Sequence, residues 1–252
     1  METFNARTLE DMSAAAKPPN HYFRRFGDLF LAMIRTGYHK WGFVIYRCAY
    51  GDDDLWNRYM AQLKENIHSE LVRAERAEIL EKYLQWDVIE DRDSLDNASK
   101  ADVRRHFAGW VSEHIANQPC ESVKTPLIAE RIARFRYCLY VDQKCLDTLE
   151  QFQNSEGDFV GQIAQYSRPP MVIVLVDSQW TPSRKGVPKK DRGFPPIEGT
   201  DKRNVGWLYT RALDLTSFYD ELSQNYGVVD FDDFYARPPI ISPGFSGLSM
   251  PE

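Results

Sequence analysis

The run "PPMVIVLVD", residues 169–177, constrains the fold of this chain more than any other segment. Its Val, Ile and Leu residues follow one another without polar alternation, which indicates a strand covered on both faces. Such a strand lies inside a sheet with other structure packed against it. The sequence therefore predicts a globular domain built around a buried sheet. A hydrophobic content of 43% over 252 residues is sufficient for its core.

The rest of the chain alternates between strand-like and helical segments. Strands are expected where β-branched and aromatic residues cluster, and helices where apolar residues recur every three to four positions. Ser99 and Asp102 form a capping pair at one predicted helix start. The predicted strands are residues 41–50, 84–91, 135–141 and 169–177, the predicted helices are 22–38, 55–84, 98–115 and 145–152, and a strand followed by a helix is predicted within 205–227.

This order of elements predicts an α+β fold, with a mainly antiparallel sheet of four to six strands, helices on one face and ferredoxin-like character. We expect a single α+β domain over residues 21–236, preceded by a flexible arm at 1–20. Residues 181–204 are rich in Pro, Gly and basic residues and are expected to form an exposed loop. Residues 237–252 are expected to form a proline-rich tail without regular structure.

The triplet Asp52, Asp53 and Asp54 follows the first predicted strand, in the sequence "AYGDDD". The letters YGDD also mark the metal-binding turn of RNA-copying polymerases, but that turn joins two strands. Here the following residues have helical periodicity. The aspartates are therefore expected to cap a helix, where they accept free backbone N–H groups and meet the positive end of the helix dipole.

A cation site is the alternative for the same residues, because Asp142 also closes a predicted strand. If the first and third strands lie parallel at the sheet centre, Asp52, Asp53, Asp54 and Asp142 project from one edge. Their carboxylate oxygens would there suit Mg or Mn. A bound ion would polarise a phosphoryl or carbonyl oxygen, so this alternative predicts a small-molecule enzyme. No sequence motif indicates another cofactor.

One basic cluster lies in the predicted loop, at Arg184, Lys185, Lys189, Lys190 and Arg192. It is expected either to contact an acidic or phosphate-bearing partner or simply to keep the loop solvated. The formal net charge of −6 repels nucleic acids and anionic membranes, so neither is the expected partner. An RNA-binding sheet, with Tyr46, Tyr140 and Trp207 stacked on bases, is disfavoured for the same reason.

The four cysteines match neither a zinc pattern nor a dense disulfide framework and are expected to be reduced. With no apolar run typical of a signal peptide or membrane span, the chain is expected to be intracellular and most simply cytoplasmic. Cys145, beside Lys144 near a helix start, is the least implausible nucleophile among the cysteines, but a structural cysteine is the favoured interpretation. His114 lies on an apolar helix stripe and is expected to be packed. No catalytic residue is identified.

Five segments together carry a family resemblance: "FVIYRCAYGDDDLW", "WDVIEDRDSLDNASKADVRRHFAGWV", "FRYCLYVD", "VGWLYTRALDL" and "YARPP". Over most of residues 40–240 the chain resembles a large group of uncharacterised proteins of filamentous fungi. The resemblance implies a fungal, intracellular source. It implies no activity and no catalytic residue.

The function that these patterns favour is binding or interaction, with a protein or a small molecule as the partner. No nucleophile, base or phosphate-cradling motif stands out in the sequence. The expected surface combines the aromatic-rich strand ends with the basic loop. The Mg- or Mn-assisted enzyme is the alternative.

Overall fold

The structure is a computed structural model of the chain and describes residues 8–9, 26–118, 132–155, 168–181, 191–223, 231, 235–242 and 248–250. Within the segment expected to be a flexible arm, Thr8 and Leu9 are described. Leu9 is buried in the hydrophobic core. At this point the segment packs against the domain.

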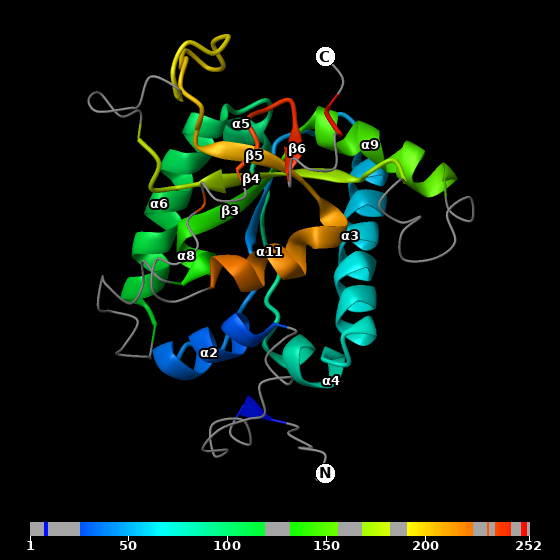
Figure 1. Ribbon diagram of the computed structural model, residues 1–252, viewed down its shortest axis with the longest axis vertical. Helices are drawn as coiled ribbons and strands as arrows, with labels where there is room; N and C mark the ends of the chain where they lie inside the picture. The colour runs from blue at the N-terminus through cyan, green and yellow to red at the C-terminus, as the bar shows by residue number, and fades with distance from the viewer. Residues whose placement is uncertain are drawn as a thin grey trace.

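A mixed sheet of six strands runs through the molecule in the order β2-β1-β3-β4-β5-β6 (Figure 1). Five strands point in one direction and β4 points in the other, since β4 is antiparallel to both of its neighbours and the remaining pairs are parallel. The strands are β1 (Val44–Arg47), β2 (Asp87–Ile89), β3 (Tyr137–Val141), β4 (Val172–Asp177), β5 (Trp207–Arg211) and β6 (Ile241–Ser242).

Helices pack on both faces of this sheet (Figure 1). Tyr46 on β1 hydrogen-bonds His106 on α6, whereas its neighbour Arg47 pairs with Asp53 on α3. Because consecutive strand side chains point to opposite faces, α6 and α3 lie on opposite sides. The helices are α2 (Gly27–Thr36), α3 (Asp53–Arg73), α4 (Ala77–Leu80), α5 (Arg92–Leu95), α6 (Lys100–Ala116), α8 (Ala133–Arg136), α9 (Gln143–Asn154) and α11 (Leu215–Leu222), with 3-10 turns η1 (Glu81–Tyr83) and η4 (Ala212–Asp214).

The fold is therefore α/β, and the prediction of a mainly antiparallel, ferredoxin-like sheet with helices on one face is wrong. The units β1-α3-β2 and β2-α6-β3 each return the chain to a parallel strand. The physical reason is length, because helices of 21 and 17 residues carry the chain back across the whole sheet. The next strand then starts from the same edge as the previous one.

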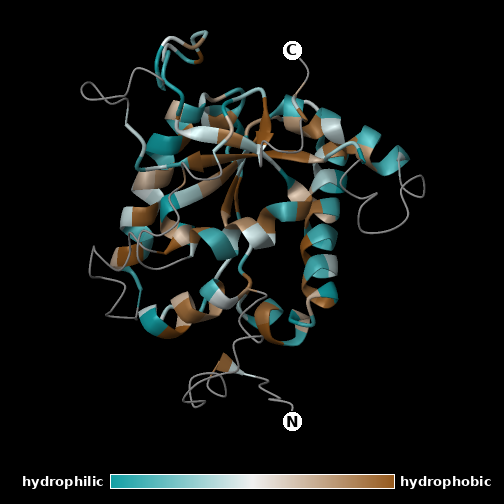
Figure 2. Cartoon of the chain, in the orientation of Figure 1, coloured by the Kyte–Doolittle hydropathy of each residue, from teal (hydrophilic) through white to brown (hydrophobic). Residues whose placement is uncertain are grey.

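The core confirms the prediction that residues 169–177 contain a strand covered on both faces. Every residue of β4 is buried, with β3 and β5 as its neighbours in the sheet. Helix α6 contacts β4 from one side, and α9, which lies beside α3, contacts it from the other. Figure 2 shows the apolar strands at the centre and polar residues on the outer helix surfaces. Within the described ranges, no helix is both long enough and apolar enough to cross a membrane.

Two local predictions require correction. The helix expected to continue to residue 84 ends at Arg73, because Glu75 takes a left-handed conformation (φ 58°) and the short helix α4 then begins separately. The proline-rich tail contributes β6, which pairs with β5 in parallel. Its prolines Pro238 and Pro239 precede the strand, so they remove no ladder hydrogen bond from it.

Candidate functional site

The carboxyl ends of β1 and β3 form the first candidate site. The chain leaves β1 through α3 toward β2 and later returns through α6 to β3, on the other side of β1. These connections cover opposite faces, which creates a topological switch point, the place where open α/β sheets commonly bind ligands. The two strands are parallel neighbours, with Arg47 beside Val141 at their ends. The parallel pairing of the first and third predicted strands, from which a shared edge for Asp52, Asp53, Asp54 and Asp142 was predicted, is therefore present.

Two of these aspartates hold helix N-termini. Asp52 caps α3 by accepting the backbone N–H of Leu55 at 2.8 Å. Asp142 caps α9 in the same way, by accepting the N–H of Cys145 at 3.0 Å. The capping interpretation of the acidic triplet is confirmed, because Asp53 and Asp54 occupy the first turn that Asp52 opens.

The other two aspartates point to different environments. Both are exposed, but Asp53 forms an ion pair with the buried guanidinium of Arg47, whereas Asp54 takes no part in that pair. Across the described part of the chain, no three His, Cys, Asp or Glu side chains are placed to hold a metal ion. The shared edge thus brings the aspartates onto one side of the sheet without assembling a set of ligands.

The cysteines near this edge are buried thiols. Burial, followed by the nearby Asp142 carboxylate, raises the pKa of Cys48 to about 12. Burial also raises the pKa of Cys145 well above its ordinary value, and its Sγ lies 3.9 Å from the carbonyl oxygen of Tyr140. A nucleophilic thiol needs a lowered pKa and access to solvent. These surroundings favour the structural alternative for Cys145.

The histidine expected to be packed is packed. The His114 ring stacks on Trp110, with ring centres 4.4 Å apart, and lies 3.5 Å from the hydroxyl of Tyr38. Burial, followed by the positive charge of Arg134, lowers the pKa of His114. The neutral ring is therefore favoured.

The predicted basic loop lies mostly outside the described residues. Arg184, Lys185, Lys189 and Lys190 are among the undescribed ones. Arg192 is described and exposed, near the beginning of residues 191–206, which we call the 191–206 segment. Part of the predicted loop is therefore ordered structure that leads directly into β5.

The aromatic residues considered for base stacking share one face of the sheet. Tyr46 lies beside Tyr140 in the register, and both are covered by residues at or near α6. The Tyr140 hydroxyl donates to the carbonyl oxygen of Ala98 at 2.9 Å. Tyr46, Tyr140 and Trp207 are all buried. They therefore do not form the open platform on which RNA-binding sheets stack bases.

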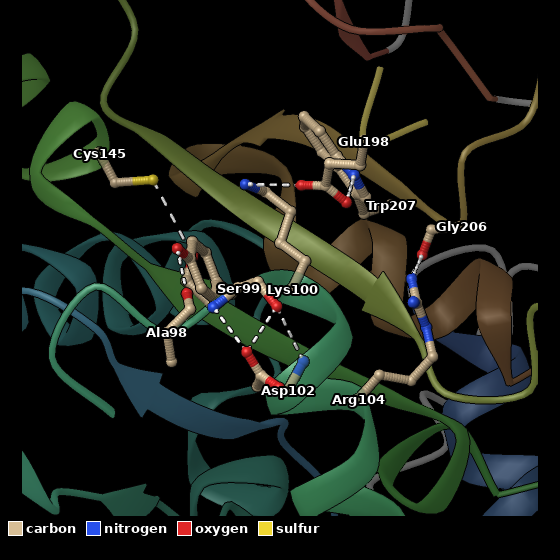
Figure 3. Close-up of polar contacts among 10 residues, drawn as sticks. Ala98, Ser99, Lys100, Asp102, Arg104, Cys145, Glu198, Gly206 and Trp207 are labelled. Carbon is tan, nitrogen blue, oxygen red and sulfur yellow. Dashed lines mark hydrogen bonds and ion pairs between the residues drawn. The ribbon is translucent and has the colours of Figure 1, made fainter. Parts of the chain in front are cut away.

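The ammonium group of Lys100 lies between two of these rings. Its Nζ is 4.7 Å from the centre of the Tyr140 ring, 4.4 Å from that of Trp207 and 3.6 Å from Oε1 of Glu198. The Lys100 side chain is only 12% exposed. Figure 3 shows it reaching toward Glu198 beside Trp207. We call these four residues the Lys100 site.

The sequence places Lys100 at an unusual point, the first residue of α6. Ser99 and Asp102 form the predicted capping box, with backbone-to-side-chain distances of 3.1 and 3.3 Å. A cation in a first helical turn meets the positive end of the dipole and is disfavoured by about 0.3–1 kcal/mol. The aromatic faces and Glu198 offset this cost. Residues that go against a local structural preference, as Lys100 does at this helix start, are expected at functional sites.

Glu198 reaches the site from a two-residue turn in the 191–206 segment. Ile197 and Thr200 exchange backbone hydrogen bonds of 3.0 and 2.9 Å, and the residues between them, Glu198 and Gly199, have φ values of 48° and 79°. Such turns favour Asn, Asp or Gly at both central positions. Glu198 is an exception, and its carboxylate contacts Lys100 through Oε1 and the Trp207 Nε1–H through Oε2, at 3.3 Å.

Arg237 holds the backbone around this turn. Its guanidinium donates to the carbonyl oxygens of Pro195 at 2.7 Å, Arg203 at 3.2 Å and Thr200 at 3.3 Å, and to that of Lys202. The segment is therefore fixed independently of the Glu198 side chain.

The sequence patterns pointed to two of the four residues of this site. Tyr140 and Trp207 were predicted, although for base stacking, whereas Lys100 and Glu198 were not. Two signals were available in the sequence. A lysine directly follows the Ser99 cap, and Glu stands before Gly199 where a tight turn favours Asn or Asp.

Compared with models of known protein families, with curated proteins and with solved structures, the chain matches none. The resemblance to a group of fungal proteins therefore stays a prediction. Function has to be inferred from the chemistry of the sites.

Proposed function

We propose that this chain is a binding protein that recognises a carboxylate-bearing segment of a partner protein through the Lys100 site. The observation that carries the proposal is the position of Lys100 Nζ, largely removed from water between two rings and 3.6 Å from a carboxylate oxygen. An ammonium group in such surroundings attracts a carboxylate more strongly than a fully solvated lysine does.

Two donors from different elements suit the proposed ligand group. Lys100 comes from α6, and the Trp207 indole N–H comes from β5. In the structure each donor faces one oxygen of the same carboxylate, that of Glu198. The pair thus matches the two oxygens of an acidic group, and both donors stand on regular elements that keep their spacing.

The location of the site favours a protein partner over an enclosed small molecule. The Glu198 side chain is 42% exposed, so the carboxylate position is reached directly from the surface. Small-molecule sites are usually concave cavities. A described cavity lies elsewhere, between α2 and α11, where Leu29, Met33 and Tyr219 line it.

The basic residues that precede the 191–206 segment in the sequence support an acidic partner, whereas the segment itself has equal numbers of basic and acidic residues. Arg192 is exposed within the segment, and the basic residues of the predicted loop precede it in the chain. The whole chain carries a formal net charge of −6, so attraction of an acidic partner has to be local. Local attraction between exposed charges is screened by salt beyond about 10 Å at 0.1 M ionic strength.

The alternative, a Mg- or Mn-assisted enzyme at the β1-β3 edge, has less support. Asp52 and Asp142 already accept helix N–H groups, and Asp53 is paired with Arg47. A metal ion would have to share these carboxylates with the interactions that already orient them.

Fluorescence anisotropy with two labelled peptides tests the proposal. One peptide is rich in Glu and the other carries Gln at the same positions. The wild-type chain is expected to prefer the Glu peptide, and the preference should weaken as salt rises. Lys100→Met should reduce affinity for the Glu peptide on the order of tenfold, since it removes a desolvated charge from the interface.

Lys64 provides a matched control. Its Nζ lies 5.7 Å from the ring centre of Trp86, and its side chain is exposed on α3. Lys64→Met should therefore retain wild-type affinity. Equal binding of both peptides by the wild type would overturn the proposal, as would wild-type affinity in Lys100→Met. If Lys100→Met does not fold, Lys100→Arg keeps the charge and should retain binding, whereas Lys100→Gln should not.

A further inference from the structure

We infer that the Glu198 carboxylate occupies the position that the partner's carboxylate takes on binding, against Lys100 and Trp207. The chain therefore blocks its own binding site until a partner displaces the Glu198 side chain. The inference rests on the proposed function and adds a regulatory contact within the same chain. It also indicates that the ligand group is a carboxylate, because a carboxylate occupies this position in the free protein.

The contacts of the Glu198 carboxylate with Lys100 and Trp207 are long. Charge-assisted hydrogen bonds between an ammonium and a carboxylate are typically about 2.7–2.9 Å long. The distance from Lys100 Nζ to Glu198 Oε1 is 3.6 Å, and that from Trp207 Nε1 to Oε2 is 3.3 Å. A carboxylate on a separate chain is free of the constraint imposed by the turn and is able to approach both donors more closely.

Release of Glu198 requires only a side-chain rotation. The backbone of the turn is held by the two hydrogen bonds between Ile197 and Thr200 and by Arg237. The Glu198 side chain is already 42% exposed, so its displaced carboxylate enters water. The partner therefore does not need to unfold the 191–206 segment in order to bind.

The local backbone also indicates that Glu198 is present for its side chain. With φ at 48°, it occupies a conformation in which L-residues other than Asn and Asp are uncommon. Glycine would suit this position better. The position holds Glu198 instead, and its carboxylate contacts both Lys100 and the Trp207 indole N–H.

The test measures binding of the labelled Glu-rich peptide to Glu198→Gln and Glu198→Gly in the full chain. Both variants remove the internal competitor, and we expect affinity to rise roughly fivefold, the factor set by a partly exposed ion pair. Glu75 is the matched control, because it is an exposed Glu with φ at 58°. Glu75→Gln and Glu75→Gly should leave affinity unchanged.

A second measurement detects directly whether a carboxylate is bound at the Trp207 indole N–H. In the wild type, the NMR signal of the Trp207 indole N–H should shift when the peptide is added. In Glu198→Gln the signal should respond to sodium acetate at lower concentration than in the wild type. A structural role for Glu198 alone would not produce a lower acetate requirement.

The outcomes separate this inference from the proposed function. If the wild type and Glu198→Gln bind the peptide equally, the proposed function stands and the self-blocking contact is overturned. Weaker binding by Glu198→Gln also overturns it, because Glu198 would then belong to the binding surface. If no variant prefers the Glu peptide, the proposed function itself fails and the inference fails with it.

Discussion

Asp220 on α11 accepts the backbone N–H of Leu29 at 2.7 Å, across 191 positions in the sequence. Helix α2 begins after Phe26, which supplies no side-chain cap of its own. A carboxylate from another helix therefore caps α2. Burial, with contributions from Asp28 on α2 and Glu221 on α11, raises the pKa of Asp220 to about 7.

This raised pKa predicts that stability falls as pH rises. Between about pH 4 and pH 7 the folded chain keeps a proton on Asp220 that the unfolded chain releases, so the free energy of unfolding decreases over that window. From about pH 5.5 to 7 the loss should be about 1.6 kcal/mol, because the slope of about 1.4 kcal/mol per unit falls to half as the pH reaches the folded pKa. Asp220→Asn keeps an acceptor for Leu29 and should remove this contribution.

Urea unfolding of both proteins across the window checks the prediction. The raised pKa values of Glu70, Asp214 and Glu221 act in the same direction in both proteins, so the difference between the two curves isolates Asp220. Parallel curves for the wild type and Asp220→Asn would contradict the assignment.

The capping aspartates should contribute to stability whether or not a divalent ion is present. Asp52→Ala and Asp142→Ala each remove one cap, at a cost of about 1 kcal/mol. Because these oxygens accept helix N–H groups, the cost should be the same with and without Mg²⁺ or Mn²⁺ in thermal melts. A metal-dependent rise in the wild-type melting temperature that disappears in Asp142→Ala would instead support the enzyme alternative.

Arg134 should be among the residues most sensitive to substitution. Its side chain is 0% exposed, pairs with Asp87 and donates to the carbonyl oxygens of Gly42 and Gln85 at 2.5 and 3.2 Å. Arg134→Met leaves a partly buried carboxylate and two carbonyl groups without this donor, and should cost about 3–5 kcal/mol. Chemical denaturation measures the change.

The exposed pair of Arg105 and Asp102, at 3.0 Å, is the control for Arg134. Surface ion pairs are worth about 0–1 kcal/mol, so Arg105→Met should have little effect. Similar losses in Arg105→Met and Arg134→Met would show that burial does not decide the contribution of these pairs.

The buried thiols should be unreactive in the folded chain. In a Cys120→Ser background, Cys48, Cys138 and Cys145 should not react with a thiol reagent such as DTNB near pH 8, because burial raises the pKa of each. All three should react once urea unfolds the chain. Fast labelling of Cys145 under native conditions would revive its assignment as a nucleophile.

Local features of this protein were predictable because they depend on neighbours in the sequence. The apolar run of β4 marks a strand buried on both faces, and the pair Ser99 and Asp102 marks a helix start. The aspartates after β1 cap α3 for the same reason, since a cap and its N–H partner lie three residues apart. Even the shared edge of Asp52 and Asp142 followed from assuming two parallel strands.

The sequence was enough to predict strands β1 to β5, the main helices and the caps of α3 and α6, because hydrophobic periodicity and capping act over a few residues. It did not predict β6 or the cap that Asp220 provides for α2, which depend on segments far apart in the chain. Tertiary structure alone decided the direction of the strands, the covering of both sheet faces and the meeting of Lys100 with Glu198, 98 positions apart. The strand directions depend on the edge of the sheet to which the long helices carry the chain. The contact between Lys100 and Glu198 depends on which side chains this packing brings together away from water. Neither property is encoded within any one segment, so the Lys100 site emerges only when α6, β3, β5 and the 191–206 segment pack together.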